Sequence, residues 1–171
     1  VLGVHSIDHF ALAVPDLEDA RRFYSLFGLD VRESDGGLHL FTQGNLHRWG
    51  VITQGAGAKQ LRYLSFGVYA DEMDAFAAHL DACGVTYIDA PTSADTQGIW
   101  FSGFDGLPIN IRPADQATPA EKSHFSFASA PPGQSGAILN SQAPKVHPRR
   151  LSHFAIFTTD VNAAITYYEK T

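Results

Sequence analysis

Cysteine is almost missing from this chain, since Cys83 is the single one among 171 residues. One thiol excludes a disulfide framework and a cysteine-rich zinc module, and it is typical of a reducing compartment. No apolar run approaches the roughly 18 residues that a membrane-spanning helix needs. The first residues do not have the pattern of a signal peptide. We therefore expect a cytoplasmic protein with no membrane partner.

Positive charge is also in short supply. The chain has 12 lysine and arginine residues against 18 aspartate and glutamate residues, which gives a formal net charge of −6. A protein that binds nucleic acid needs an uncompensated basic surface to displace counterions from the phosphates. The charge balance therefore argues against nucleic acid as a partner.

Apolar and aromatic residues, by contrast, are plentiful. Hydrophobic residues make up 44% of the chain, with 12 phenylalanines and 6 tyrosines among them. This composition can build a real core and excludes intrinsic disorder of the whole chain. The length suits one compact domain, or one domain and a fragment of a second.

An internal repeat organises the sequence. When residues 9–24 are laid over residues 153–168 without a gap, six of the sixteen pairs are identical, including the opening His-Phe-Ala and a later Asp. A weaker copy starts near Tyr63 with a short apolar run followed by an acidic residue. Such self-similarity indicates one structural unit used several times.

Each copy reads as a strand followed by a helix. Asp16 is a natural N-cap for a helix with apolar residues at helical spacing, and Gly28 can end that helix in the left-handed conformation. In the second copy Asp71 is the expected N-cap and Gly84 the expected end. Asp160 takes the same place in the third copy.

Short strand candidates follow each of the first two helices. They comprise residues 29–33, 38–43, 49–54, 86–88, 98–102 and 107–112, with a hairpin at Asp105-Gly106. The unit is therefore strand, helix and three strands, used twice between residues 5 and 113. This order predicts an α+β fold in which paired βαβββ modules form a cupped mixed sheet with helices on its outer face.

The order of units predicts three regions. Residues 1–113 form a domain of two modules, and residues 114–149, rich in proline, serine, glycine and glutamine, form a linker. Residues 150–171 contain only the strand and helix of a third copy, and such a pair cannot bury its apolar face alone. We therefore expect this sequence to be part of a longer protein, with a second domain starting at residue 150.

Paired modules that open with a His-Phe-Ala-aliphatic strand and an Asp-capped helix resemble the vicinal oxygen chelate superfamily. That superfamily includes glyoxalases, bleomycin-resistance proteins and type I extradiol ring-cleaving dioxygenases. Four modules in two domains joined by a linker are most similar to the dioxygenases of catechol and 2,3-dihydroxybiphenyl breakdown. The resemblance covers residues 5–113 and 150–171.

The resemblance implies an Fe(II) centre in the second domain. Two imidazoles and one carboxylate would hold the iron and leave positions open for a catechol and for dioxygen. His153 matches the position of the first histidine ligand. The remaining ligands and the catalytic residues are expected beyond residue 171, so residues 1–171 alone are expected to be inactive.

The first domain departs from the family's ligand pattern. His9 occupies the first ligand position, but Tyr63 stands where a second histidine is expected and Asn110 where glutamate is usual. A neutral phenol and a carboxamide bind divalent iron poorly. We therefore expect residues 1–113 to hold no metal and these three residues to be vestigial.

The functional hypothesis is an Fe(II)-dependent extradiol dioxygenase whose partners are a small aromatic diol and dioxygen. One alternative is a binding protein of the glyoxalase or bleomycin-resistance type that holds a small molecule without catalysis, and another is a different metal or reaction in the same superfamily. The apolar helix face in residues 151–171 needs a cover, from the rest of the chain or from another subunit, and a homo-oligomer is expected.

Several side chains fit structural roles better than functional ones. Cys83 is expected to be an inert buried thiol, and Trp49 and Trp100 are expected to pack on the sheet, although either could line the cup. The other histidines show no mutual metal spacing and are expected on the surface or in loops. They are His5, His39, His47, His79, His124 and His147.

Overall fold

The structure is a computed structural model, and it describes residues 2–92, 94–122, 133, 136 and 146–171. Its secondary structure follows the two predicted modules closely. The helices in these described ranges are all too short or too polar to cross a membrane.

The first module has one helix between its first and second strands. Its elements are β1 (Ser6–Val14), α1 (Leu17–Phe27), β2 (Asp30–Ser34), β3 (Gly37–Phe41) and β4 (Arg48–Gln54). The second module repeats this order with two added 3-10 turns. Its elements are β5 (Gln60–Val68), η1 (Ala70–Glu72), α2 (Met73–Cys83), β6 (Thr86–Tyr87), β7 (Ile99–Ser102), η2 (Phe104–Gly106) and β8 (Pro108–Pro113).

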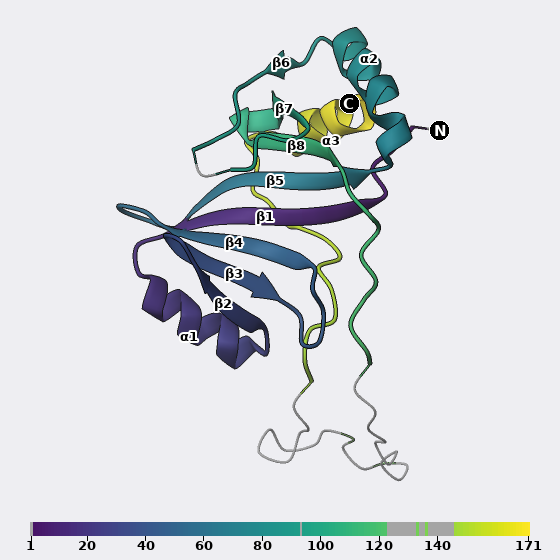
Figure 1. The fold of residues 1–171 in the computed structure, drawn as a ribbon. Coiled ribbons are helices and arrows are strands. Elements are labelled where there is room, and N and C mark those ends of the chain that lie inside the picture. The colour runs from purple at the N-terminus through teal and green to yellow at the C-terminus, as the bar shows by residue number, and fades with distance from the viewer. Residues whose placement is uncertain (1, 93, 123–132, 134–135, 137–145) are drawn as a thin grey trace.

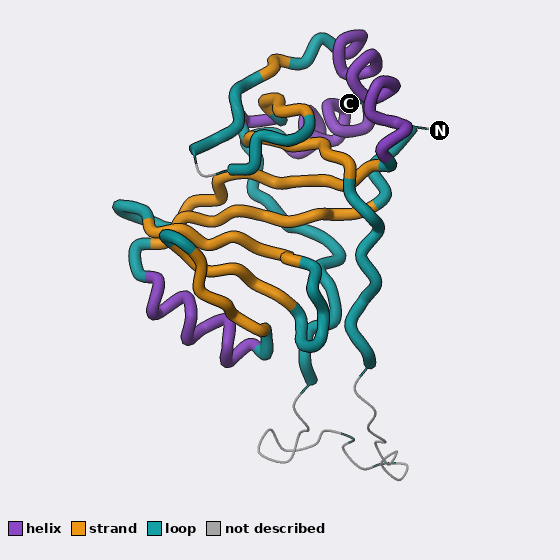
Figure 2. Tube along the Cα trace, in the orientation of Figure 1, coloured by secondary structure: helices purple, strands orange, loops and turns teal. Residues whose placement is uncertain are grey.

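The eight strands form one mixed sheet in the order β2-β3-β4-β1-β5-β8-β7-β6. The first strands of the two modules, β1 and β5, pair antiparallel at the centre. Each is also paired in parallel with the last strand of its own module, β1 with β4 and β5 with β8. Figures 1 and 2 show the strands as a continuous band with α1 at one end and α2 at the other. The predicted α+β class and module order are confirmed.

Apolar side chains divide between the two faces of the sheet. On the outer face, α1 packs on a cluster that includes Leu40 and Ile52, and α2 contributes Phe76 and Leu80 to a second cluster. The inner face carries a smaller cluster in which Tyr63 contacts Trp100. Because the helices cover only the outer face, the inner face is left open in the middle for polar side chains.

The helix ends test the capping predictions. The Asp16 carboxylate accepts a hydrogen bond from the Asp19 amide, as predicted, and Gly28 and Gly84 both have left-handed backbone conformations. The prediction that Asp71 caps the second helix is wrong. A 3-10 turn at Ala70–Glu72 precedes α2, so Asp71 lies inside that turn, and no side chain caps α2.

The third copy forms its helix but not its strand. Asp160 caps α3 (Val161–Lys170) by accepting from the Ala163 amide, as predicted. Residues 151–158 form no helix and pair with no strand within the described chain. They pass behind the central strands in Figure 1, and Phe154 packs edge-on against Phe10. A segment that crosses the outer face contacts side chains of the sheet and finds no free strand edge beside it, so it cannot form a ladder.

The helix of the third copy packs on the second module. Ala164 is buried, and the Tyr167 hydroxyl donates to the Ser102 carbonyl at 2.8 Å. Cys83, expected to be buried, is half-buried beside the Lys170 carbonyl. The chain itself therefore covers part of the helix face that was expected to need a cover.

The two ends of the predicted linker lie side by side. The Ala120 amide donates to the Arg149 carbonyl at 2.9 Å, and the Arg149 Nε donates to the Ala120 carbonyl at 2.6 Å. Most of residues 123–145, including His124, lies outside the described residues. The assignment of 114–149 as a linker between domains remains a prediction.

Candidate functional site

A bulge in β1 places two neighbouring side chains on the inner face. The pairing of β1 with β5 shifts by one residue between Ile7 and His9, so Asp8 is the extra residue. At a bulge the strict alternation of faces is broken. Asp8 and His9 consequently lie close enough for the His9 Nδ1 to contact the Asp8 carboxylate at 2.8 Å.

Both ring nitrogens of His9 have hydrogen-bond partners. His9 is only 2% exposed. An ionised carboxylate can only accept, so Nδ1–H donates to Asp8, and in the neutral ring Nε2 then accepts from the Tyr63 hydroxyl, 3.1 Å away. Burial raises the pKa of Tyr63, so its hydroxyl keeps its proton at neutral pH. Neither nitrogen of His9 has a lone pair free for another ligand.

Asn110 joins the same network through Ser65. The Ser65 hydroxyl lies 2.9 Å from the Asn110 Oδ1 and 3.3 Å from the Asp8 carboxylate. The Asn110 Nδ2 donates to the carbonyls of Gln97 and Ile99. The structure therefore brings His9, Tyr63 and Asn110 together, and their polar groups have hydrogen-bond partners among the described residues.

Charged groups around Asp8 stabilise its ionised form. Its carboxylate lies 3.8 Å from the Arg112 Nε and 3.8 Å from the His47 Nε2. Burial alone would raise the pKa of Asp8, but the hydrogen bond from His9 and the electrostatic effects of His9, Arg112 and His47 outweigh it and lower the pKa. Asp8 is thus a buried anion at neutral pH.

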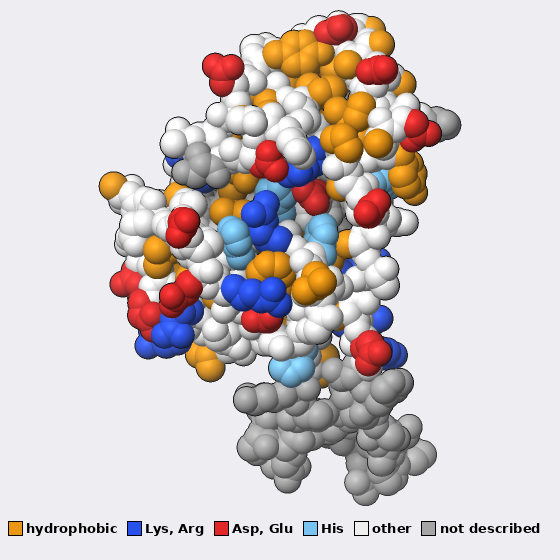
Figure 3. Space-filling model, in the orientation of Figure 1, with side chains coloured by type: hydrophobic (Ala, Val, Ile, Leu, Met, Phe, Trp, Pro, Cys, Tyr) orange, Lys and Arg blue, Asp and Glu red, His pale blue; other side chains and the backbone are white. Residues whose placement is uncertain are grey.

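A polar hollow of about 490 Å³ opens beside this network. Its lining includes His9, His39, His47 and Arg48, and Figure 3 shows histidine and arginine side chains gathered near the middle of this face. The prediction that His39 and His47 are surface or loop residues is wrong for His39, which lies on β3 and pairs with Val51 of β4. It is confirmed for His47, which lies in the loop before β4, where its Nε2 donates to the Asp8 carbonyl at 2.7 Å.

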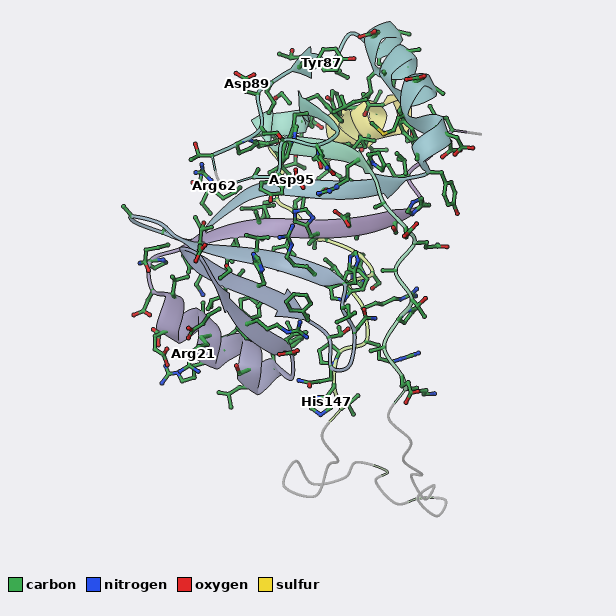
Figure 4. The ribbon with its side chains drawn as sticks, in the orientation of Figure 1. Arg21, Arg62, Tyr87, Asp89, Asp95 and His147 are labelled. Atoms are coloured by element: carbon green, nitrogen blue, oxygen red, sulfur yellow. The ribbon has the colours of Figure 1, made fainter. Side chains whose placement is uncertain are left out.

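Arg112 links the hollow to the chain that precedes β7. Its guanidinium lies 3.1 Å from the Asp95 carboxylate and donates to the Gln97 side chain at 2.9 Å. In the view of Figure 4, Asp95 lies over the central strands, whereas Arg21 and His147 lie at the margin of the molecule. Asp95 and Arg112 therefore hold residues 95–97 over the inner face.

The structure keeps His153 apart from these residues. Its exposed imidazole contacts only the neighbouring Ser152 hydroxyl, at 2.9 Å, among the described residues. The segment that carries it lies across the outer face, whereas His9 faces inward. His153 is therefore a single exposed imidazole in this structure, and its assignment as an iron ligand remains a prediction.

The residues present do not fit an Fe(II) centre. Within the described ranges, no group of three His, Cys, Asp or Glu side chains is placed to hold a metal ion. On the inner face, His9 is fully hydrogen-bonded, and a phenol and an amide occupy the other two positions. One free imidazole at His153 cannot hold iron alone.

Sequence reasoning missed Asp8 and Ser65. These two residues join His9, Tyr63 and Asn110 into one network. Asp8 would face away from His9 in a regular strand, so only the bulge reveals it. Ser65 pairs directly with His9 across β1 and β5, and its place two residues after Tyr63 on the same face was the available signal. Trp100 lines the cup beside Tyr63, and its buried Nε1 has no partner among the described residues.

Comparison with known proteins decides the family. Residues 6–111 match the model of the Glyoxalase/Bleomycin resistance protein/Dioxygenase superfamily. The chain belongs to this superfamily. The matched residues run from the first residue of β1 into β8, so they contain nearly all of both modules and the hydrogen-bonded residues Asp8, His9, Tyr63, Ser65 and Asn110.

One curated relative matches almost the entire chain. Metapyrocatechase 2 of Cupriavidus necator is 38% identical over 166 residues, which are 97% of this chain and 51% of the relative. The chain therefore spans about half the length of this relative.

Solved structures share the fold at lower identity. A homoprotocatechuate 2,3-dioxygenase variant from Brevibacterium fuscum has a TM-score of 0.67 at 20% identity and covers 98% of this chain and 44% of that one. A catechol 2,3-dioxygenase has a TM-score of 0.66 at 21% identity and covers 98% and 58%. A Mn(II)-bound glyoxalase from Novosphingobium aromaticivorans has a TM-score of 0.53 at 21% identity and covers 71% and 46%.

Proposed function

We propose that this chain is the metal-free first half of an extradiol dioxygenase that opens the ring of a small aromatic diol with dioxygen. The observation that carries this proposal is the match of 97% of the chain, at 38% identity, to about half of Metapyrocatechase 2. The hydrogen-bonded state of His9 supports the metal-free role of residues 1–113. The natural protein would then be longer than 171 residues.

The metal is proposed to be Fe(II), held in a second domain that begins near residue 150. His153 would supply one imidazole, and the other ligands and the catalytic residues would lie beyond residue 171. The described residues supply the complete first sheet, which would serve as a scaffold. We also propose that the protein acts in the cytoplasm, a reducing compartment that is consistent with one cysteine. We propose in addition that it forms a homo-oligomer.

The test uses the natural protein that contains this chain. Its intact mass, its iron content and its ring-cleaving activity on catechol, followed by the yellow product, are measured together. We expect a mass about twice that of this chain, about one iron per subunit and a ring-opened product. A protein without stoichiometric iron that binds catechol unchanged would contradict the proposal and favour a binding protein.

Two histidine variants locate the metal. We expect His153→Ala to lose both iron and ring cleavage, because an iron site with one ligand missing binds metal weakly. His9→Gln is the matched control in the other copy of the repeat, and we expect it to keep its iron. Loss of iron from the His9→Gln protein alone would show that the metal lies in the first domain.

A further inference from the structure

Arg48 is a half-buried arginine that forms no ion pair with an acidic residue of the described chain, although its charge contributes to lowering the pKa of Asp95. It begins β4 at a register shift and lines the polar hollow. Within the described part of the chain it makes no hydrogen bond or ion pair. Two other strand arginines are paired with aspartates, Arg32 with Asp30 and Arg112 with Asp95, and Arg62 donates to the Gln60 side chain. The Arg48 side chain thus lines the hollow and its N–H donors have no partner among the described residues.

The acidic groups nearby are occupied by other residues. The Asp8 carboxylate accepts from His9 and Ser65 and lies beside Arg112. The Asp95 carboxylate is bound to Arg112 and to the Gln97 amide. These carboxylates are held in place and leave the fork of Arg48 open to a ligand.

His39 offers a second open group in the same hollow. Its ring packs against Phe41 with centroids 6.5 Å apart, and it makes no hydrogen bond with a described residue. Burial and the positive charge of Arg48 lower the pKa of His39, so its ring is neutral at pH 7 and keeps one N–H donor. Arg48 and His39 are therefore two donor groups without described partners, and they lie beside the buried ring of Phe41.

We propose that this hollow binds a small organic carboxylate, with Arg48 as the principal anion-binding residue and His39 as a second donor. A single guanidinium fork matches the two oxygens of a planar carboxylate. The hollow has a volume of about 490 Å³, which is larger than a bare ion occupies and lies within the usual range for small-molecule sites. A phosphate dianion is disfavoured because the ionised Asp8 lies in the same wall.

This site does not depend on the proposed ring cleavage. It lies on the inner face of residues 1–113, whereas the proposed iron centre is in another domain. The carboxylate site is tested by ligand binding and the dioxygenase proposal by iron content and ring cleavage. Either proposal can therefore fail without affecting the other.

The probe is benzoate, titrated calorimetrically into the natural protein that contains this chain. We expect a Kd of about 1 mM or below. Hydrogen exchange of the same sample should slow at residues 37–48, which carry His39 and Arg48, and should not change in α1. No binding up to 10 mM, taken as about ten times that Kd, or protection elsewhere only, would overturn the proposal.

Three variants test the role of the guanidinium. We expect Arg48→Gln to weaken benzoate binding about tenfold or more. The benzoate affinity of Arg48→Lys should lie between those of Arg48→Gln and the parent, because lysine keeps the charge but not the forked guanidinium. Arg62→Gln is the control, since Arg62 is also a strand arginine but lies outside the hollow. Inorganic phosphate is titrated in parallel.

Each result of these titrations decides the proposal. Benzoate binding that is unchanged in both Arg48 variants would overturn it. Phosphate binding tighter than benzoate binding, and dependent on Arg48, would overturn the carboxylate assignment. Arg48→Lys and the exchange data of the parent keep the test valid if Arg48→Gln fails to fold.

Discussion

At the residue scale, His9 has a structural role in the described chain. An imidazole with both nitrogens hydrogen-bonded is held between a carboxylate and a phenol, and a metal would have to displace Tyr63 to reach it. That Tyr63 and Asn110 carry groups that bind iron poorly was readable from the sequence. The position of Asp8 beside His9 on the inner face was not readable from the sequence. A strand pattern assigns neighbouring residues to opposite faces, and a bulge depends on the partner strand.

The hydrogen bond between Tyr63 and His9 predicts a specific cost. Tyr63→Phe leaves the buried Nε2 of His9 without a partner, so we expect the free energy of unfolding to fall by about 1–2 kcal/mol. Tyr87→Phe is the control, because the Tyr87 hydroxyl bonds Asp81 on the exposed surface and its loss should cost less than about 0.5 kcal/mol. Urea unfolding measures both variants, and equal effects would contradict a structural role for the buried pair.

Asp8 predicts how stability depends on pH. Its pKa is lower in the folded chain than in the unfolded chain, so the carboxylate stabilises the fold fully above about pH 4. This contribution is lost as the pH falls through the lowered pKa. We expect Asp8→Asn to reduce the free energy of unfolding by about 1–3 kcal/mol at pH 7.

The gap between Asp8→Asn and the parent should shrink as the pH falls through the lowered pKa of Asp8, because the parent then also carries a neutral side chain. Urea unfolding at several pH values measures the gap, with the exposed Glu33→Gln as the control. A gap that stays constant from neutral to acidic pH would show that the charge of Asp8 contributes nothing.

At the scale of elements, local signals predicted helices well where a capping side chain sets the first turn. Asp16 and Asp160 both accept the amide three residues on, and each helix begins as expected. Asp71 has the same residue type at the equivalent place but lies in a 3-10 turn. The residue type alone does not reveal this difference, because the turn depends on how β5 leaves the sheet.

Asp16 and Asp71 form a matched pair for a test of helix capping. We expect Asp16→Ala to lower the free energy of unfolding by about 1 kcal/mol, since the Asp19 amide loses its acceptor. Asp71→Ala removes no cap and should change it by less than about 0.5 kcal/mol. Thermal or urea unfolding compares the two, and a larger effect at Asp71 would show that the cap predicted from the sequence forms after all.

At the scale of the whole molecule, the sequence predicted the pairing of modules but not the position of the third copy. The modules follow from periodicity and turns within each unit. A strand at 151–158 needs a neighbouring strand edge, and none lies beside this segment in the described structure. Phe154 packs on the outer face instead, while Phe157 stays exposed, and no local pattern could reveal this.

This packing predicts the result of removing the returning segment. A chain of residues 1–122 keeps all eight strands but loses the cover that Phe154 and α3 give to the outer face. We expect it to keep its β-rich circular dichroism, to unfold at a lower urea concentration than residues 1–171 and to bind more of a hydrophobic dye. The reason is that Phe10, packed under Phe154, and the Ser102 carbonyl, bonded to Tyr167, become exposed to water. Equal midpoints and equal dye binding would show that residues 146–171 contribute nothing to this sheet and pack elsewhere in the natural protein.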